Sequence, residues 1–368
     1  MKILLVNAIA SGGAYAALQK FHEELSINGH TCTIMTPWSN YRRQYFRIHI
    51  LRIFLRILYK FILIRRTKSV VSTQIIPTGL GAKIDECHAD LAILFWVSDS
   101  ISLSEISELK TPFLWRQSDN NLILPFEHYP ENKVKCRIAN LEKWILQKKK
   151  DFIYRNKMKV FGPSAKTVDS INYFVNNSAF TLRTPINKIY SNLPLTFRLN
   201  NKKILHFGFV SYKEQDLDRK NWKDVERFVE IVGRYRQCII KHMGGSTLAS
   251  LAVKVENCGF ITREDDKILE FYDKIDALLF FSRQDNAPQV VLEAMARGCP
   301  VICYNVKGIA DVIEDNMKKY IIDRVDEDVV LNVINNLSFE NFAVRNQRIR
   351  EISEKNFFNV DDLLRKIR

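Results

Sequence analysis

The stretch that decides the fold runs from residue 285 to residue 302 and reads Asp285-Asn286-Ala287-Pro288-Gln289-Val290-Val291-Leu292-Glu293-Ala294-Met295-Ala296-Arg297-Gly298-Cys299-Pro300-Val301-Ile302. Before it, the apolar run at 277–281 predicts a buried strand, and Pro300–Tyr304 predicts another. Pro288 stands where a helix can begin, because the first turn does not need its missing N–H, and Gly298 is typical of a helix end. In an open α/β sheet, ligands bind outside the carboxyl ends of the strands, which is where Asp285 falls.

This stretch resembles the signature of retaining glycosyltransferases of family 4, which have the GT-B fold. That family carries two acids eight positions apart on such a loop and helix. Glu293 matches the second acid, and Asp285 stands at the first, where the broad family has Glu. The form Gln284-Asp285-Asn286-x-Pro288 resembles the branch that builds bacterial surface polysaccharides, the colanic-acid type. The resemblance implies that Asp285 holds a hydroxyl of the donor sugar and Glu293 the ribose hydroxyls, since ionised carboxylates accept hydrogen bonds.

A loop before another predicted helix supplies the cations of the expected donor site. A strand near Lys203–Gly208 leads through Arg219 and Lys220 to a helix from about Lys223 to Tyr235. Lys220 matches a Lys that the family has before this helix. The family's Arg after the strand glycine is missing, with Phe209 nearby, so Arg219 is expected to supply that charge. A solvated pair of loop cations is the alternative interpretation.

Two glycines follow the first predicted strand, Met1–Asn7, and precede a helix predicted from about Tyr15 to Asn28. Glycines at this point let a phosphate approach the N–H groups of a helix N-terminus, although a plain turn explains them as well. The residues assigned to the donor site are Gly12, Gly13, Arg219, Lys220, Asp285, Asn286, Ala287, Pro288, Gln289 and Glu293.

The acceptor side shows more departures from the family. Phe95 and Ser118 stand where the resembling stretches carry histidines, whereas Asp119 is retained. We expect Asp119 to make a polar contact near the reacting sugar, with a loop-capping role as the alternative. His128 belongs to a segment that resembles a later family stretch, and a structural role suits it equally well. The expected catalytic residues are Asp119, Lys220 and Asp285.

A basic segment without acids marks the N-terminal half. No Asp or Glu occurs from Leu25 to Ile84, in a chain with 55 basic and 41 acidic residues and a net charge of +14. Residues 41–66 predict an amphipathic helix. At helical spacing one face holds Tyr45, His49, Arg52, Arg56 and Lys60, and the other holds Ile50, Phe54, Ile57, Leu58 and Phe61.

Three uses of this helix follow from its pattern. It is a poor membrane span, because each Arg or Lys in mid-helix costs roughly 2.5–3.5 kcal/mol, but it suits the interface of an anionic membrane. A core helix with a solvated basic stripe is the alternative. Nucleic acid is a third possibility, yet no known binding motif accompanies the helix. We therefore expect residues 42–66 to meet an anionic membrane surface and expect no nucleic-acid partner.

Length and composition predict two α/β domains. The chain has 368 residues, of which 46% are hydrophobic and 26% charged, as in globular proteins. Alternating strands and helices favour α/β layers, and the resemblance implies two Rossmann-like domains in the GT-B arrangement. We expect an acceptor-binding domain at 1–185, a nucleotide-sugar-binding domain at 186–358, and a C-terminal helix at 359–368 that crosses back to the first domain. The polar stretch Arg198–Lys202 is expected at the end of the linker.

The cysteines indicate neither a metal site nor a disulfide framework. They are Cys32, Cys87, Cys136, Cys238, Cys258, Cys299 and Cys303, with no C-x-x-C pair among them. Free thiols suit the reducing cytosol, and the N-terminus shows no signal-peptide pattern. We expect a cytoplasmic protein, peripheral on the inner face of the membrane, without a cofactor or a bound metal.

The function implied by the resemblance is transfer of a sugar, with retained anomeric configuration, from a nucleotide-diphosphate sugar to a glycan or lipid-linked glycan acceptor. Lys220, Arg219, the N–H groups at Gly12–Gly13 and the helix end after Asp285 would stabilise the leaving diphosphate. Two alternatives stay open: a GT-B protein that binds or epimerises a nucleotide sugar without transfer, and a protein whose function is membrane-surface binding.

Overall fold

The structure of the chain is a computed structural model, and it describes residues 1–368 except 40–44, 66–70, 129–133, 157–158, 176–178, 187–189, 191–203, 212–216, 246, 262–266, 355–359 and 368. It divides into two compact units, Met1–Pro185 with Phe358–Arg368 and Ile186–Phe357. The C-terminal helix α13 (Val360–Ile367) thus groups with the N-terminal unit. The stretch Arg198–Lys202, expected at the end of the linker, lies outside the described residues.

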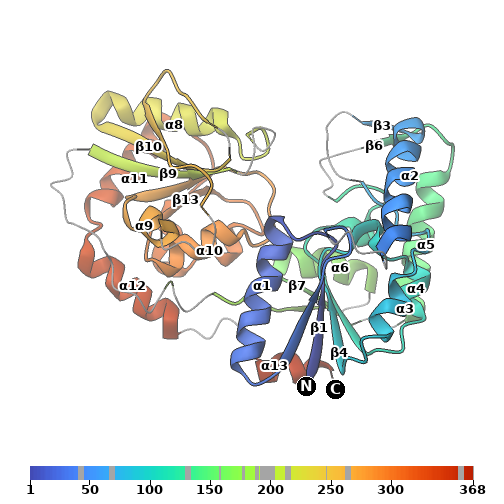
Figure 1. Cartoon of the computed structure of the whole chain (residues 1–368). Helices are drawn as coiled ribbons and strands as arrows, with labels where there is room; N and C mark the ends of the chain where they lie inside the picture. The colour runs from blue at the N-terminus through green and yellow to red at the C-terminus, as the bar shows by residue number, and fades with distance from the viewer. Residues whose placement is uncertain are drawn as a thin grey trace. The chain divides into compact units, whose positions relative to one another are not determined.

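The first unit is built on a sheet of six parallel strands. Their order is β2 (Thr31–Met35), β1 (Lys2–Val6), β4 (Leu91–Leu94), β5 (Phe113–Arg116), β7 (Val160–Gly162) and β8 (Phe180–Thr181). In β1, Ile3 and Leu5 pack with side chains of α1 (Gly12–Ile27) and α13, while Leu4 and Val6 pack into the cluster on the other face. Figure 1 shows α1 and α13 beside this sheet. Both faces are apolar, as a parallel sheet covered by helices on both sides requires.

The other face of the first sheet carries most of the remaining helices of this unit. They are α2 (Phe46–Ile62), α3 (Leu80–Asp85), α4 (Leu103–Ser107), α5 (Leu141–Asn156) and α6 (Ala165–Val175). A short antiparallel pair, β3 (Leu63–Arg65) with β6 (Val134–Cys136), continues directly from α2. Two turns of 3-10 helix, η2 (Ser98–Ser100) and η3 (Asn121–Ile123), follow β4 and β5.

The second unit is also a doubly wound parallel sheet. Its strand order is β11 (Lys254–Asn257), β10 (Gln237–Met243), β9 (Ile204–Val210), β12 (Ala277–Phe280), β13 (Val301–Tyr304) and β14 (Ile321–Ile322). Its helices are α8 (Trp222–Tyr235), α9 (Lys267–Asp273), α10 (Gln289–Ala296), α11 (Glu327–Ser338) and α12 (Phe342–Glu354). In chain order the strands run 3-2-1-4-5-6, which is the order of Rossmann-type sheets.

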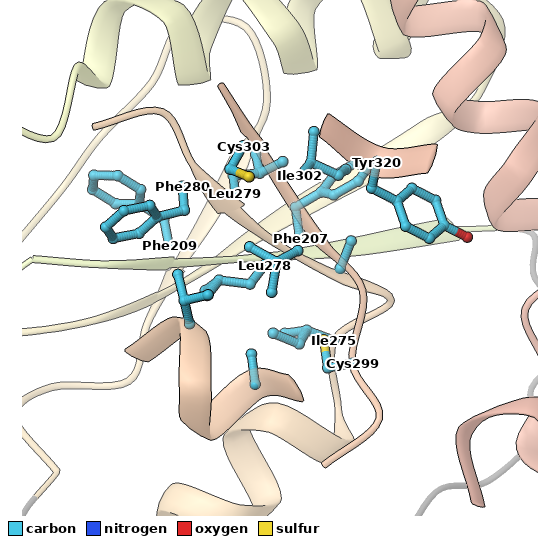
Figure 2. Packing of buried hydrophobic residues seen from close by; sticks show 14 of the residues in the cluster. Phe207, Phe209, Ile275, Leu278, Leu279, Phe280, Cys299, Ile302, Cys303 and Tyr320 are labelled. Atoms are coloured by element: carbon cyan, nitrogen blue, oxygen red, sulfur yellow. The ribbon is translucent and has the colours of Figure 1, made fainter. Parts of the chain in front are cut away.

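The core of the second unit lies on both sides of its central strands. Figure 2 shows Phe207 of β9, Leu278 of β12 and Ile302 of β13 in one buried cluster. Each fully buried side chain of this size contributes about 1.5–3 kcal/mol relative to exposure. Burial raises the pKa of Cys299 to about 11 and that of Cys303 to about 12, so these thiols stay neutral and act as core residues.

The helix expected within residues 41–66 is present as α2, while residues 41–44 and 66 lie outside the described part of the chain. Its orientation differs from the core-helix interpretation and agrees with an exposed apolar face, as the membrane interpretation requires, although part of the cationic face packs inward. The apolar face is exposed, whereas Tyr45 is buried and Arg52 is half-buried with its guanidinium 4.4 Å from the Trp38 ring centroid. The interpretation as a core helix with a solvated basic stripe is therefore wrong, because most side chains of the apolar face are exposed.

Gly298 ends α10, as predicted, and the structure shows why glycine is required. Its φ is +63°, and a Cβ atom would lie 2.4 Å from the carbonyl oxygen of Arg345 on α12. We expect Gly298→Ala to destabilise the second unit by about 3 kcal/mol or more, because backbone strain and a clash with backbone add together. Gly29→Ala is the control: its φ is +81°, but a Cβ there meets nothing within 4 Å. It should cost only about 1 kcal/mol, and equal losses in thermal unfolding would contradict this explanation.

Candidate functional site

The candidate donor site of the second unit lies at the carboxyl ends of β9 and β12. These strands are neighbours in the sheet, yet the chain continues from them toward opposite edges. In doubly wound sheets, ligands bind in the crevice at such a switch point. Arg219 and Lys220 lie between β9 and α8, and Asp285 lies between β12 and α10. Residues some 65 positions apart therefore converge where the topology favours a ligand.

Two cations face one carboxylate in this site. Oδ2 of Asp285 lies 3.7 Å from Nζ of Lys220 and 3.6 Å from Nη1 of Arg219. The Lys220 side chain is 11% exposed and that of Arg219 38%, so solvent screens Lys220 less. Nζ of Lys220 also lies 4.3 Å from the centroid of the Phe280 ring. Lys220 is thus held between Asp285 and the Phe280 ring and is not a solvated loop residue.

The loop after β12 is held in an uncommon conformation. The Ser282 hydroxyl lies 3.3 Å from the Arg219 carbonyl oxygen and 2.9 Å from that of Gln284, which links the two site loops. Ala287 has φ +58°, a region that L-residues rarely adopt, and its N–H donates to the carbonyl of Gly308 over 2.8 Å. Strain of this kind is found at ligand sites. The turn also places Pro288 at the N-cap of α10, one position before the predicted first turn.

Glu293 is buried on α10, one turn from its N-terminus. Its Oε2 lies 3.1 Å from the hydroxyl of Tyr272, which donates to it. Burial, reinforced by the charge of Glu293, raises the pKa of Tyr272 well above its usual value, so the phenol remains a donor. The helix itself is fixed by Arg297, whose guanidinium donates to both carboxylate oxygens of Asp273 over 2.8 and 2.7 Å.

The remaining donor-site candidates lie at two helix N-termini. In the second unit, Asn286 is buried, its N–H donates to Asp285 Oδ1, and the Oε1 atom of Gln289 is buried without a partner among the described residues. In the first unit, α1 begins at Gly12, three residues before its predicted start, so Gly12 and Gly13 form its first turn. A Cβ at either glycine would meet no atom within 4 Å. Their N–H groups belong to the first turn, whose donors have no helical acceptor.

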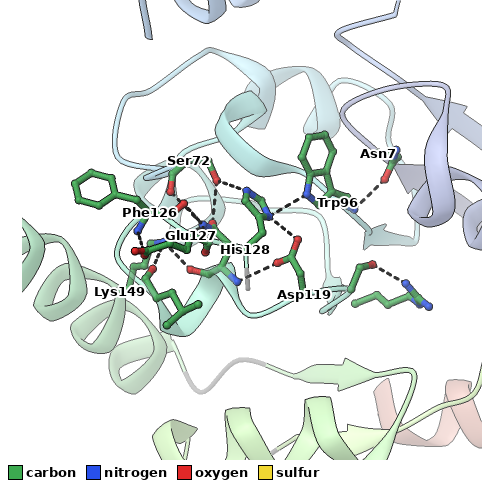
Figure 3. A network of polar contacts seen from close by, with 12 residues as sticks. Asn7, Ser72, Trp96, Asp119, Phe126, Glu127, His128 and Lys149 are labelled. Carbon is green, nitrogen blue, oxygen red and sulfur yellow. Dashed lines mark hydrogen bonds and ion pairs between the residues drawn. The ribbon is translucent and has the colours of Figure 1, made fainter. Parts of the chain in front are cut away.

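On the acceptor side, the structure brings Asp119 and His128 together in a buried network (Figure 3). Oδ2 of Asp119 lies 2.5 Å from Nδ1 of His128, and Oδ1 accepts from the N–H of Asn121 over 3.0 Å. Nε2 of His128 lies 3.1 Å from the Ser72 hydroxyl, and the indole N–H of Trp96 points to Nδ1 over 3.2 Å. Both carboxylate oxygens of Asp119 are engaged, so it positions His128 and the loop at 119–128.

The two positions where histidines were missing have structural roles. Phe95 is a core residue whose ring packs edge-on against Phe21. The Ser118 hydroxyl accepts from Nη1 of Arg116 over 2.6 Å, and Arg116 also donates to Thr184. Burial lowers the pKa of Arg116 to about 10, which leaves it charged at neutral pH.

Lys149 also belongs to this network, although the sequence prediction did not single it out (Figure 3). Its Nζ donates to the carbonyls of Asn121 and Leu124 over 2.6 and 2.7 Å, and the side chain is completely buried. Lys149 stands among three consecutive lysines, so composition does not single it out. Its helical phase does, because it lies four residues after Ile145 and three before Phe152, both buried.

We expect Lys149 to make the stability of the first unit depend on pH. Burial lowers its pKa to about 7, although Asp99, Asp119 and Glu127 act in the opposite direction, whereas an unfolded Lys titrates near pH 10.4. Between these values the unfolded chain binds more protons, so the free energy of unfolding should rise with pH, by at most about 1.4 kcal/mol per unit. Tryptophan fluorescence during urea unfolding follows this unit, which holds four of the five tryptophans. Lys149→Met should remove the rise between about pH 7 and 9, and parallel pH slopes for variant and wild type would contradict this.

Within the described residues, no group of three or more His, Cys, Asp or Glu side chains is arranged to hold a metal ion. Among the helices that the structure describes, none has the length and apolar character needed to cross a membrane. Two hollows of about 490 and 600 Å³ flank α8 in the second unit, but neither is lined by Lys220, Asp285 or Glu293.

Comparisons with known proteins add to this geometry. Residues 218–355, less than half of the chain, match the family described as "Glycosyl transferases group 1", and this span includes Arg219, Lys220, Asp285 and Glu293. No curated protein matches the sequence closely enough to count as a relative.

Many solved structures share the fold. They include HepE from Anabaena in complex with UDP-glucose, at 12% identity and a TM-score of 0.60, covering 100% of this chain and 98% of that one. Sucrose-phosphate synthase from Thermosynechococcus elongatus matches at 14% identity and a TM-score of 0.64, and the match covers 100% of this chain and 99% of that one. The lipopolysaccharide outer core galactosyltransferase WaaB matches at 14% identity and a TM-score of 0.59, and this match also covers 100% of this chain and 99% of that one. The predicted GT-B fold, with two Rossmann-like domains, is thereby confirmed.

Proposed function

We propose that this protein is a retaining glycosyltransferase that moves a sugar from a nucleotide-diphosphate sugar to a glycan or lipid-linked glycan in bacterial surface polysaccharide synthesis. The observation that carries the proposal is the convergence of Lys220, Arg219 and Asp285 at the switch point of the second sheet. Support comes from the family match over the same residues and from neighbours described with UDP-glucose or as lipopolysaccharide galactosyltransferase. Family 4 and its colanic-acid branch remain part of this proposal.

The chemistry follows from where charge develops. When the bond between the anomeric carbon and the diphosphate breaks, negative charge grows on the leaving phosphate oxygens, and Lys220 with Arg219 would stabilise it. Because Asp285 already holds both cations near one point, little reorganisation is needed when the diphosphate binds. Asp285 would then accept a hydrogen bond from a donor-sugar hydroxyl. Glu293 would bind the ribose hydroxyls. The strained turn at Ala287 favours a ligand beside α10, as does Oε1 of Gln289, which has no partner among the residues that the structure describes.

The proposal needs no metal ion, because side-chain cations and helix N-termini carry the counter-charge. On the acceptor side, Asp119 would act through His128, which its carboxylate orients, and not by direct contact with the sugar. The N–H groups of Gly12 and Gly13 would bind phosphate oxygens at the N-terminus of α1.

We place the reaction at the inner surface of an anionic membrane, with a lipid-linked glycan as acceptor. The exposed cations Arg47, Arg56 and Lys60 on α2 support this, since each contributes about 1 kcal/mol near an anionic surface. The described cysteines are free thiols, which suits a reducing compartment. Arg52, also expected on this cationic surface, is held against Trp38 instead.

A donor screen tests the proposal. Thermal unfolding is followed with UDP-, GDP- and CMP-sugars, each with and without a chelator, and hits are confirmed by calorimetry. We expect one nucleotide family to raise the unfolding temperature in proportion to its affinity, and we expect the chelator to leave that shift unchanged. No shift with any nucleotide sugar would count against the proposed function, and a shift lost with the chelator would count against metal independence.

A further inference from the structure

The outer face of α2 carries a continuous apolar surface. Six large side chains between 50% and 69% exposed make up this outer stripe: Phe46, Ile50, Ile53, Phe54, Ile57 and Phe61. At about 100° per residue they fall within a sector roughly 100° wide, so they form one band along the helix. Scattered exposed apolar residues are ordinary, but a contiguous band of this size marks a surface that meets an apolar partner.

The inner face of α2 fixes which way this band points. Ile48, Leu55 and Tyr59 are buried against the first unit. The Tyr59 hydroxyl donates to Oδ2 of Asp99 over 2.8 Å and lies 3.1 Å from the Thr73 hydroxyl. Rolling the helix to bury its outer stripe would break these contacts and lift the Arg52 guanidinium from the Trp38 ring. The outward orientation is therefore built into the fold.

The charges beside the outer stripe indicate its partner. By helical phase, Arg47 borders one edge of the stripe, and Arg56 and Lys60 border the other; all three are exposed. No acid occurs on α2 or anywhere from Leu25 to Ile84. A second copy of this surface would bring cations against cations, which is unfavourable in an apolar contact. A bilayer with anionic headgroups supplies both an acyl boundary for the stripe and phosphates for its borders.

We propose that the outer stripe of α2 inserts into the acyl boundary of an anionic phospholipid bilayer, with Arg47, Arg56 and Lys60 at the level of the lipid phosphates. Insertion of apolar side chains then supplies most of the affinity, and the cations select anionic lipid. This inference deepens the proposed function and rests on it only for the identity of the acceptor, since it fixes which face of the acceptor-binding unit meets the membrane.

Cosedimentation with vesicles tests the inference on the full chain. One vesicle type mixes phosphatidylglycerol and phosphatidylcholine in roughly equal amounts, and the other is phosphatidylcholine alone, each at low and high salt. The stripe variant carries Phe54→Ser, Ile57→Ser and Phe61→Ser. The matched control carries Ile27→Ser, Tyr154→Ser and Leu251→Ser, three exposed apolar residues elsewhere. The cation variant carries Arg47→Gln, Arg56→Gln and Lys60→Gln.

We expect the stripe variant to lose at least about 100-fold of its partition onto anionic vesicles, because three large apolar side chains no longer leave water. The matched control should bind like the wild type. The cation variant should lose about 10-fold or more on anionic vesicles and most of the salt dependence, since screened charges supply that part. Residual binding of the wild type to neutral vesicles should depend on the stripe alone.

Equal partition of the wild type and the stripe variant would overturn the inference. So would a wild-type dimer in light scattering that the stripe variant converts to monomer while neither binds vesicles, because the stripe would then belong to a second copy. Nucleotide-sugar binding, measured on the same preparations, separates this result from the proposed function. A wild type that binds the nucleotide sugar but not vesicles would contradict the membrane inference alone. A wild type that binds vesicles but not the nucleotide sugar would contradict the proposed function alone.

Discussion

Lys220→Ala is expected to lower the rate of sugar transfer by about 100- to 1,000-fold while weakening nucleoside monophosphate binding much less. The reason is the place of its ammonium group, 3.7 Å from Asp285 and largely shielded from water at the switch point of the second sheet. A donor aimed at developing charge in such a site contributes roughly 2.7–4 kcal/mol to the transition state. Initial rates and calorimetry with the monophosphate give the two quantities.

Arg219→Ala provides the comparison for this prediction. Its guanidinium lies at a similar distance from Asp285 but is more than three times as exposed. Because solvent screens this charge more strongly, Arg219→Ala should lower the rate of sugar transfer less than Lys220→Ala does, by only about 10-fold. If Lys220→Ala lowers transfer and monophosphate affinity equally, or lowers neither, Lys220 does not stabilise the leaving diphosphate.

Glu293→Ala is expected to weaken nucleotide-sugar binding by about 10- to 150-fold, as a hydrogen bond to a charged acceptor contributes roughly 1.5–3 kcal/mol. The carboxylate is buried on α10 and oriented by the Tyr272 hydroxyl. Calorimetry with the donor found in the screen measures this loss, and circular dichroism checks that the variant is folded.

Tyr272→Phe separates ligand contact from local structure at this position. It removes the hydrogen bond to Glu293 but leaves the carboxylate in place, so donor affinity should fall only slightly. If Tyr272→Phe reduces affinity as much as Glu293→Ala, the acid serves the packing of α10 and not the ribose. Unchanged affinity in a folded Glu293→Ala protein would make the site assignment wrong.

Local sequence pattern was sufficient for the segment that decided the fold. The apolar runs at 277–281 and 300–304 contain β12 and β13, and α10 ends where Gly298 predicted. Such features depend on neighbours in the chain, namely helical periodicity, β-branched runs and a glycine in the left-handed region. The start of α1 was predicted three residues too far along the chain. Glycines at positions 12 and 13 are typical of a turn, but here they begin the helix.

The polar network of the first unit could not be predicted, because its partners are far apart in the chain. Lys149 binds carbonyls of Asn121 and Leu124, and Tyr59 of α2 binds Asp99. Helical spacing identified two faces of α2, but it could not say which face would pack inward. Arg52 on Trp38 and Tyr59 on Asp99 decide that question, and neither contact has a local signature.

The central claim is transfer of a sugar from a nucleotide diphosphate to an acceptor, and its most direct test measures both products together. Purified protein is incubated with the donor selected by the screen and a lipid-linked glycan, with chelator present, while released nucleotide diphosphate and sugar on the lipid are quantified. The account predicts equal amounts of the two, release that depends on acceptor, and a linkage that keeps the donor's anomeric configuration. Donor binding without acceptor-dependent release, or conversion of the donor to an epimer, would contradict it.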